Sequence, residues 1–311
     1  MRNVWFVLLG ILIITTACEK KGDKDSVKDK IQGRAQAVSL LGEPLFAGTP
    51  AEKSLEHLKQ ARKDYLSDPN DTDNIVWYGR RAAYTGDYRN AVRIYTEGIS
   101  KFAGDARFYR HRGHRYISLR EFDNAINDFQ KAVSLIEGKE DMIEPDGLPN
   151  AQNIPLSTLH TNIWYHLGLA YYLKNDLDNA LKAYQEGIEA SKNDDMLVAM
   201  LHWHYMSLRL LERDEEAAQS IEPVHKDMNI IENMAYHKLC LLYKGDVSVE
   251  EIAGEDFSNI MNDALAYGIG NWYFYNERKE EAREVFESIL ANKVWASFGH
   301  IAAEAQLARE F

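Results

Sequence analysis

A glycine-led pattern that occurs four times constrains the fold of this 311-residue chain more than any other feature. In each occurrence a glycine is followed at +3, +12, +16 and +19 by the same kinds of residue, mostly small or aromatic. The occurrences begin at Gly79, Gly113, Gly168 and Gly270. Offsets of 3 and 16 keep residues on one helical stripe, whereas the gap of 12 leaves room for a turn. The pattern therefore predicts a repeat protein whose units are pairs of antiparallel helices that cross closely at small residues.

The pattern resembles the tetratricopeptide repeat, which has a period of about 34 residues and places small and aromatic residues at these offsets. Gly113 follows Gly79 by one such period, whereas the step from Gly113 to Gly168 exceeds one period, so an insertion precedes the third unit. The resemblance covers most of residues 50–311. It implies an all-α fold, a right-handed superhelical solenoid of antiparallel helix pairs.

Residues 51–311 are expected to form this solenoid. A weaker unit has Tyr205 in the glycine position, and the step from Tyr205 to Gly270 is close to two periods, which leaves room for a degenerate unit between them. The predicted units are 72–105, 106–137, 161–194, 198–228, the degenerate 230–260 and 263–294, with a closing helix at 295–310 and the insertion at 138–158.

Residues 1–17 predict an export signal, because an almost wholly apolar run over residues 4–14 follows a weakly positive start. The run is shorter than the roughly 20 residues that span a membrane. The small residues that end at Cys18 resemble the lipobox of bacterial lipoproteins, which implies lipidation of Cys18, although Thr15 departs from the usual leucine. An ordinary signal peptide or an uncleaved anchor is the alternative. Residues 18–50 predict a lipid-attached flexible tether and an irregular lead into the solenoid.

The resemblance to lipoproteins implies a lipid-anchored protein of the bacterial cell envelope, with the outer membrane as its expected location. The chain has 36 basic and 48 acidic residues, a net charge of -12, and loss of Arg2 with the signal gives 35 minus 48, or -13. Such acidity argues against nucleic acid as a partner. The only other cysteine, Cys240, lies in an apolar stretch and is expected in the core, without a disulfide.

No catalytic, metal or cofactor motif stands out in the sequence. The best-spaced histidine pair, His111 and His114, has arginines on both sides that would oppose a metal ion, and further ligands are missing. The acidic residues of the insertion do not have EF-hand spacing, which favours a solvated loop over a calcium site. Because long insertions in repeat arrays are often functional, the insertion is also a candidate lid or partner-contact loop. We therefore expect no enzyme, no metal and no cofactor.

The resemblance implies a concave groove lined by the first helices of successive units. Carrying the family's inward-facing positions onto this chain gives the candidate ligand-binding residues Arg80, Tyr84, Arg107, Arg110, His114, Asn162, Tyr165, Tyr172, His202, Arg209, Tyr267 and Asn271. Arginines beside tyrosines in an acidic protein suit an anionic or carboxylate-bearing ligand. Alternatively, these arginines pair with carboxylates on neighbouring helices. The positions lack the lysine and asparagine clamp of chaperone-binding members of the family.

The leading functional prediction is a non-enzymatic scaffold that holds a protein or peptide partner in its concave groove and reaches the membrane through the lipid on Cys18. A receptor for a small ligand or glycan is the second hypothesis. An enzyme with a histidine or carboxylate site under the insertion is the third, and no motif supports it. The sequence leaves the partner and the oligomeric state open.

Overall fold

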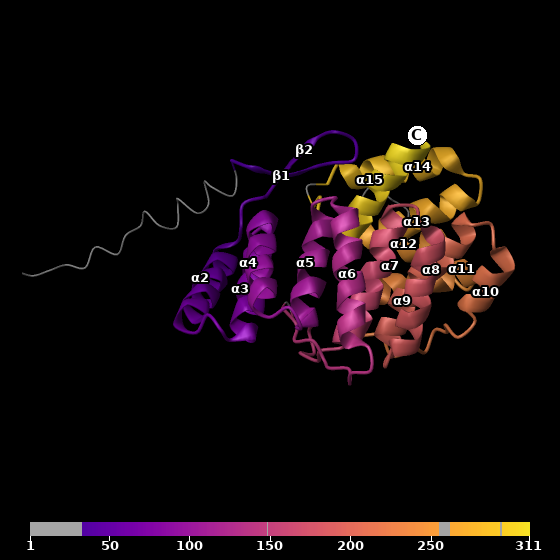
Figure 1. The fold of residues 1–311 in the computed structure, drawn as a ribbon. Coiled ribbons are helices and arrows are strands. Elements are labelled where there is room, and N and C mark those ends of the chain that lie inside the picture. The colour runs from indigo at the N-terminus through magenta and orange to yellow at the C-terminus, as the bar shows by residue number, and fades with distance from the viewer. Residues whose placement is uncertain (1–32, 148, 255–261, 293) are drawn as a thin grey trace, which may run out of the picture.

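The computed structural model describes residues 33–147, 149–254, 262–292 and 294–311. It shows a superhelical stack of helix pairs with a small β-hairpin along its upper edge in Figure 1. The prediction of an all-α solenoid is confirmed. The helices are α2 (Glu52–Ser67), α3 (Thr72–Tyr84), α4 (Tyr88–Lys101), α5 (Ala106–Ser118), α6 (Phe122–Ile136), α7 (Leu159–Leu173), α8 (Leu177–Ala190), α9 (Asp194–Leu210), α10 (Asp214–Ser220), α11 (Met234–Lys244), α12 (Val249–Ala253), α13 (Asp263–Tyr275), α14 (Lys279–Leu290) and α15 (Phe298–Glu310).

The turn inside each helix pair has one recurring geometry. A residue with positive φ follows the first helix of every pair, at Gly86, Arg120, Asn175, Glu212, Gly245 and Glu277. In each turn the next amide donates to the carbonyl five positions earlier, as Asp176 does to Tyr171 at 2.9 Å. Gly245 shows that the degenerate unit uses this turn too, although its second helix, α12, is very short.

The repeated glycines lie where the two helices of a pair cross. A Cβ on Gly168 would lie 2.5 Å from the Tyr184 ring, and one on Gly113 would lie 2.9 Å from the Phe129 ring. Both rings are fully buried. The aromatic residue of the second helix therefore fills the space that the absent side chain leaves on the first, which explains their fixed spacing.

The segment before α2 is more ordered than the irregular lead predicted from the sequence. β1 (Ala35–Val38) and β2 (Pro44–Phe46) form an antiparallel hairpin in which Ala37 pairs with Leu45. The turn between them contains Gly42 at positive φ. Strands this short give a weak sequence signal, and tertiary contacts stabilise the hairpin instead.

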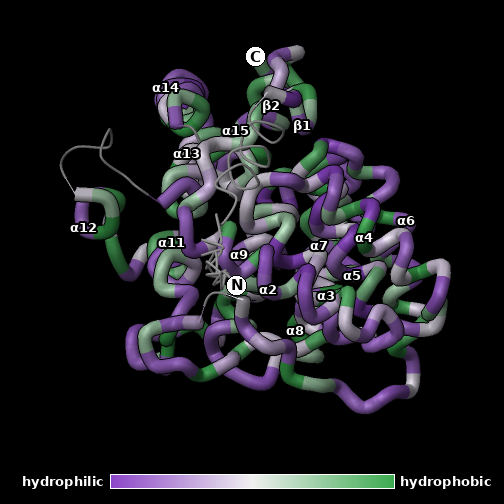
Figure 2. Tube along the Cα trace, turned by 90° about the vertical axis from the view of Figure 1, so that its left-hand side faces the viewer, coloured by the Kyte–Doolittle hydropathy of each residue, from purple (hydrophilic) through white to green (hydrophobic). Residues whose placement is uncertain are grey.

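The hairpin contacts the closing helix, and it lies beside α15 in both views of the chain (Figure 2). The Leu40 amide donates to Glu304 Oε1 of α15 at 2.7 Å, and Trp295 Nε1 donates to the Phe46 carbonyl at 2.6 Å. Arg120 pairs with the same Glu304 carboxylate at 2.7 Å. We call these five residues the clasp. It holds the hairpin, the second helix pair and the closing helix together.

Cys240 is fully buried among apolar side chains of α9 and α11, as the sequence predicts. Burial raises the pKa of its thiol, so the group is an unreactive core residue. In the described parts of the chain, no helix combines the length and the apolar character needed to cross a membrane.

Candidate functional site

The arginines predicted to line an open groove are all engaged by partners within the chain. Arg107 pairs with Asp73 and with Asp105, the latter at 2.6 Å, and these bonds raise the pKa of its guanidinium. Arg209 contacts Asp214 at 2.7 Å and stacks on the Tyr275 ring at 4.4 Å. Arg107 and Arg209 therefore pair with carboxylates inside the chain, which is the alternative that the sequence leaves open.

Arg80 and Arg110 contact the insertion instead. Arg110 Nε lies 3.0 Å from Glu144 Oε2, and Asn162 of α7 donates to the same oxygen at 3.0 Å. Arg80 Nη1 donates to the Pro145 carbonyl at 2.7 Å. Glu144 is only 7% exposed, so the expectation of a solvated acidic loop is wrong at this residue. The insertion lies over the concave face of α3, α5 and α7.

Farther along the superhelix the predicted groove residues form a buried hydrogen-bonded layer. The Tyr172 and Tyr267 hydroxyl groups are 2.7 Å apart, and Asn271 donates to Tyr172 at 3.2 Å. Burial raises the pKa of Tyr172 to about 12. Tyr165 accepts from Trp203 Nε1 at 3.0 Å. These side chains bond to one another across the helices, and their role in ligand binding stays a prediction.

His202 is likewise fully buried, where its Nδ1 lies 3.1 Å from the Tyr243 hydroxyl. Desolvation lowers the pKa of His202 to about 3, which keeps the imidazole neutral. The ring stacks on Tyr236 and Tyr243 at centroid distances of 4.8 and 5.8 Å. His202 therefore packs α9 against α11.

The closing helix enters the concave face as well as covering the end of the stack. The Phe298 ring of α15 lies 5.1 Å from the His114 ring and 5.4 Å from the His166 ring, measured between centroids. The two imidazoles are 4.5 Å apart. Desolvation, aided by nearby arginines, holds the pKa of both histidines well below the usual value. The helix predicted as a cap thus occupies the place that the sequence assigns to a ligand.

Three residues of this arrangement have no signal in the sequence. The local pattern groups Glu144 with other loop acids, and it assigns Phe298 and Glu304 only to a capping helix. A buried acid inside the insertion cannot be recognised locally, because its partners lie in the helices before and after the insertion. The Glu304 contact with Leu40 spans 264 residues. Only the fold brings these groups together.

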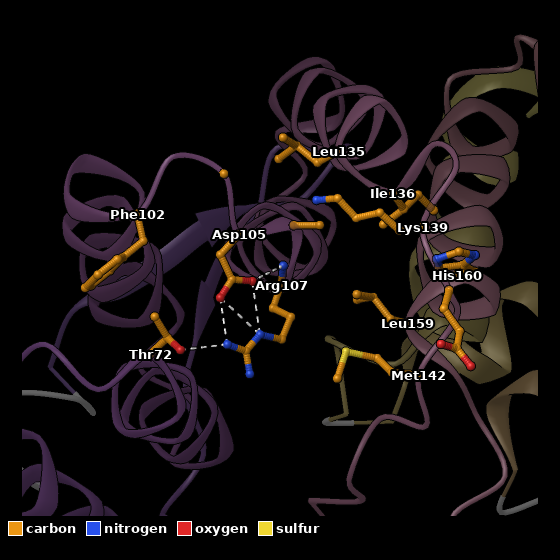
Figure 3. A pocket seen from close by; sticks show the side chains of 13 residues that line it. Thr72, Phe102, Asp105, Arg107, Leu135, Ile136, Lys139, Met142, Leu159 and His160 are labelled. Atoms are coloured by element: carbon orange, nitrogen blue, oxygen red, sulfur yellow. Dashed lines mark hydrogen bonds and ion pairs between the residues drawn. The ribbon is translucent and has the colours of Figure 1, made fainter.

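An open cleft of about 500 Å³ remains at the edge of this site, where α5 begins and the insertion leaves α6 (Figure 3). Leu135, Ile136, Leu159 and Met142 give it an apolar wall, and Arg107 lies at the opposite side. The remaining lining residues are Thr72, Phe102, Gly104, Asp105, Ala106, Lys139, Glu140 and His160. An apolar wall facing a few charged groups can hold an apolar side chain and orient the polar backbone beside it. The residues that the structure describes contain no cluster of three potential metal ligands.

A second cleft, of about 470 Å³, lies between the hairpin and the closing helix. Leu41, Leu45 and Phe46 line one side, and Trp295 and His300 line the other. It surrounds the clasp, so its shape depends on those contacts.

Comparisons with known proteins agree with the helix pairs. Residues 106–138 and 161–194 each match a sequence model described as tetratricopeptide repeat. The small glutamine-rich tetratricopeptide repeat-containing protein 2 of Saccharomyces cerevisiae is 22% identical over 158 residues, 51% of this chain and 39% of its own. The Hsp70-Hsp90 organizing protein 2 of Arabidopsis thaliana is 26% identical over 148 residues, 48% of this chain and 22% of its own. The chain thus spans less than half the length of these relatives.

Solved structures of similar proteins have low sequence identity to this chain. A tetratricopeptide repeat protein from Parabacteroides merdae is 15% identical, with a TM-score of 0.49, and the match covers 82% of this chain and 96% of that protein. YrrB, described as a TPR protein with an unusual peptide-binding site, is 16% identical, with a TM-score of 0.42, over 79% of this chain and 96% of its own. The two matched units, with the turn geometry that all the helix pairs share, show that this chain contains tetratricopeptide repeats.

Proposed function

We propose that this protein is a non-enzymatic scaffold that binds an extended segment of a protein partner, and that the cleft of Figure 3 is where the partner first contacts it. The observation that carries the proposal is that this cleft places an apolar wall opposite Arg107, at the start of the first helix α5. Repeat solenoids of this kind offer extended binding surfaces. The relatives include a protein named as an Hsp70-Hsp90 organizing protein and a co-chaperone.

The size and chemistry of the cleft favour a peptide over a large rigid surface. A volume of about 500 Å³ accommodates one or two side chains, within the range of about 300 to 1,000 Å³ usual for ligand pockets. Met142 is 52% exposed and Ile143 is 60% exposed beside it, so apolar area remains open to solvent. The lining holds two cations, Arg107 and Lys139, and two acidic residues, Asp105 and Glu140, so the cleft offers a partner segment its apolar wall and not a net charge.

Site-specific photo-crosslinking in intact cells tests this proposal. A photoreactive amino acid at Met142 should capture one or a few discrete protein partners. The same amino acid at Lys182, on the exposed side of α8, is the matched control and should capture none of them. An identical capture pattern at both positions, or no captured protein at Met142, would contradict the scaffold function.

We also propose that lipid on Cys18 anchors the scaffold in the bacterial cell envelope, at the outer membrane. Cys18 lies outside the described residues, so the support comes from the sequence alone. The described chain begins at residue 33, and its first element is the hairpin that contacts α15.

A further inference from the structure

The insertion contacts the concave face through one carboxylate and two backbone carbonyl groups. Glu144 Oε2 lies 3.0 Å from Arg110 Nε and accepts from Asn162 Nδ2 at 3.0 Å. Its other oxygen lies 3.5 Å from His111 Nε2. The contacts come from α5 and α7, two successive first helices. A single glutamate side chain is therefore bound by the inner surface of two repeat units.

The backbone next to this carboxylate is bound by the preceding unit. Arg80 Nη1 donates to the Pro145 carbonyl at 2.7 Å, and Arg81 Nη1 donates to the Gly147 carbonyl at 3.2 Å. Gly147 lies against the Tyr84 hydroxyl so closely that a side chain there would collide with it. An extended peptide bound to this face would make the same contacts. Arginines would donate to its backbone carbonyl groups, and one of its charged side chains would be buried.

The site gathers several cations around one buried carboxylate. Arg80 and Arg115 lie close enough to Arg110 to lower the pKa of its guanidinium, and Arg80 acts in the same way on Arg115. Among the described residues, Glu144 is the carboxylate paired with Arg110, whereas Arg115 contacts the Tyr88 ring and has no ion-pair partner. Burial is the largest cause of the lowered pKa of both Arg110 and Arg115, and Arg110, which is only 7% exposed, is poorly solvated. An additional anion here would find cations that water does not already satisfy.

Outside residues 144–147, the described part of the insertion is held at its base and near its second half. The His160 amide donates to Asp141 at 3.0 Å, and Asn150 donates to Glu232 at 2.5 Å. Glu144 and Gly147 are its buried members in the stretch from 139 to 147, and the flanking Met142 and Ile143 are exposed. Ile143 and Thr158 form an isolated bridge that pairs the segment with the chain that follows it. Displacing residues 144–147 would break the contacts of Glu144, Pro145 and Gly147 with α3, α5 and α7, together with the bond from the Glu144 amide to the Ser157 carbonyl. The open cleft beside Met142 gives a competing segment access to the same edge.

We propose that the segment 144–147 is an internal ligand, and that it occupies a binding site for a glutamate- or aspartate-containing extended peptide of the partner. The partner's carboxylate takes the place of Glu144 between Arg110 and Asn162, and its backbone carbonyls take the place of those of Pro145 and Gly147. This inference rests on the scaffold function proposed above and names the chemistry of the partner. It also gives the insertion a role, because the insertion keeps the site filled until a competing segment arrives.

A peptide that copies the insertion tests the inference with the full chain in detergent. The probe is a fluorescein-labelled synthetic peptide of residues 141–149, and a second peptide carries glutamine at the position of Glu144. The chain is prepared with residues 140–156 replaced by a glycine-serine linker. The glutamate peptide should bind this variant at least tenfold more tightly than it binds the unaltered chain. The glutamine peptide should bind the variant at least tenfold more weakly than the glutamate peptide does.

Two further variants make the result specific. Adding Arg110→Gln to the linker variant should abolish the preference for glutamate, whereas adding Glu186→Gln on the exposed side of α8 should leave it unchanged. If the linker variant does not fold, the full chain with Glu144→Gln answers the same question. Its internal ligand is weakened, so the glutamate peptide should bind this variant at least tenfold more tightly than it binds the unaltered chain. Equal binding of the two peptides, or no binding to a variant that keeps its helical content, would overturn the inference.

The two proposals fail in distinguishable ways. If cleft-directed photo-crosslinks still capture a partner while the peptides do not bind, the internal-ligand inference alone is wrong. If the peptides bind as expected but no partner is captured from cells, the site exists and the scaffold function is contradicted.

Discussion

The clasp between the hairpin and the closing helix gives the sharpest stability prediction. The Glu304 carboxylate is 1% exposed and the Arg120 guanidinium is 3% exposed. Arg120 donates to Glu304 through Nε at 3.0 Å and through Nη2 at 2.7 Å, and the Leu40 amide adds a third hydrogen bond at 2.7 Å. Glu304→Gln keeps the shape of the side chain but removes the charge that pairs with a buried arginine. Breaking one partner of a buried ion pair costs about 3 to 5 kcal/mol.

Glu304→Gln should therefore lower the free energy of unfolding by about 3 to 5 kcal/mol at neutral pH. Urea denaturation measures the loss, and hydrogen exchange at the Leu40 amide shows whether the hairpin detaches first. Glu287→Gln is the matched control, because Glu287 pairs with Arg283 at 2.8 Å with both side chains more than half exposed. It should cost less than about 1 kcal/mol. A loss for Glu304→Gln no larger than that of the control, with unchanged exchange at Leu40, would refute the assignment of the clasp as a buried closure.

The remaining predictions concern buried histidines, a helix crossing and the anchor. Burial holds the pKa of His114 below its unfolded value, so the unfolded chain takes up a proton first and stability falls as pH drops below about 6.5. The substitution His114→Gln removes this titration. In urea titrations it should reduce the loss of unfolding free energy between pH 7.5 and 5.5 by about 1.4 kcal/mol. An unchanged loss would show that the imidazole titrates normally. Gly168→Ala should destabilise the chain by about 1 to 3 kcal/mol in thermal unfolding, because the new Cβ would meet the Tyr184 ring. Gly104→Ala is the control and should not destabilise the chain, because the space around Gly104 is open. Equal melting temperatures for the two variants would contradict the close crossing. Cys18→Ser should release the protein from membranes in cell fractionation, and full retention through the uncut apolar segment would argue against the lipid anchor.

Local structure can be predicted from the sequence because each unit contains both partners of its main packing contact. The glycine and the aromatic residue that fills its space recur at one fixed offset, as Gly168 and Tyr184 do. The same holds for the turns, where a positive-φ residue follows each first helix. Helix pairs, their spacing and the insertion therefore follow from local pattern.

The candidate site can be predicted only in part, because its state depends on contacts between distant units. The inward-facing positions are located by their place in each repeat, and Arg80, Arg110 and Asn162 do meet at one place. Whether that place is open depends on how far the superhelix curves, which is the sum of small rotations over all units. Glu144 and Phe298 fill it from segments whose local sequence does not encode the contact.

The central claim is that the chain itself fills its concave face, and one measurement tests it directly. In a sample selectively protonated at phenylalanine and histidine rings, NMR should show nuclear Overhauser effects between Phe298 and the imidazoles of His114 and His166, whose centroids lie 5.1 and 5.4 Å away. Cross-peaks from Phe298 to both histidines would support a closed superhelix with α15 inside it. Their absence, with Phe298 giving cross-peaks only to the neighbouring α13 and α14, would mean that the groove is open and that the account of an internally filled site is wrong.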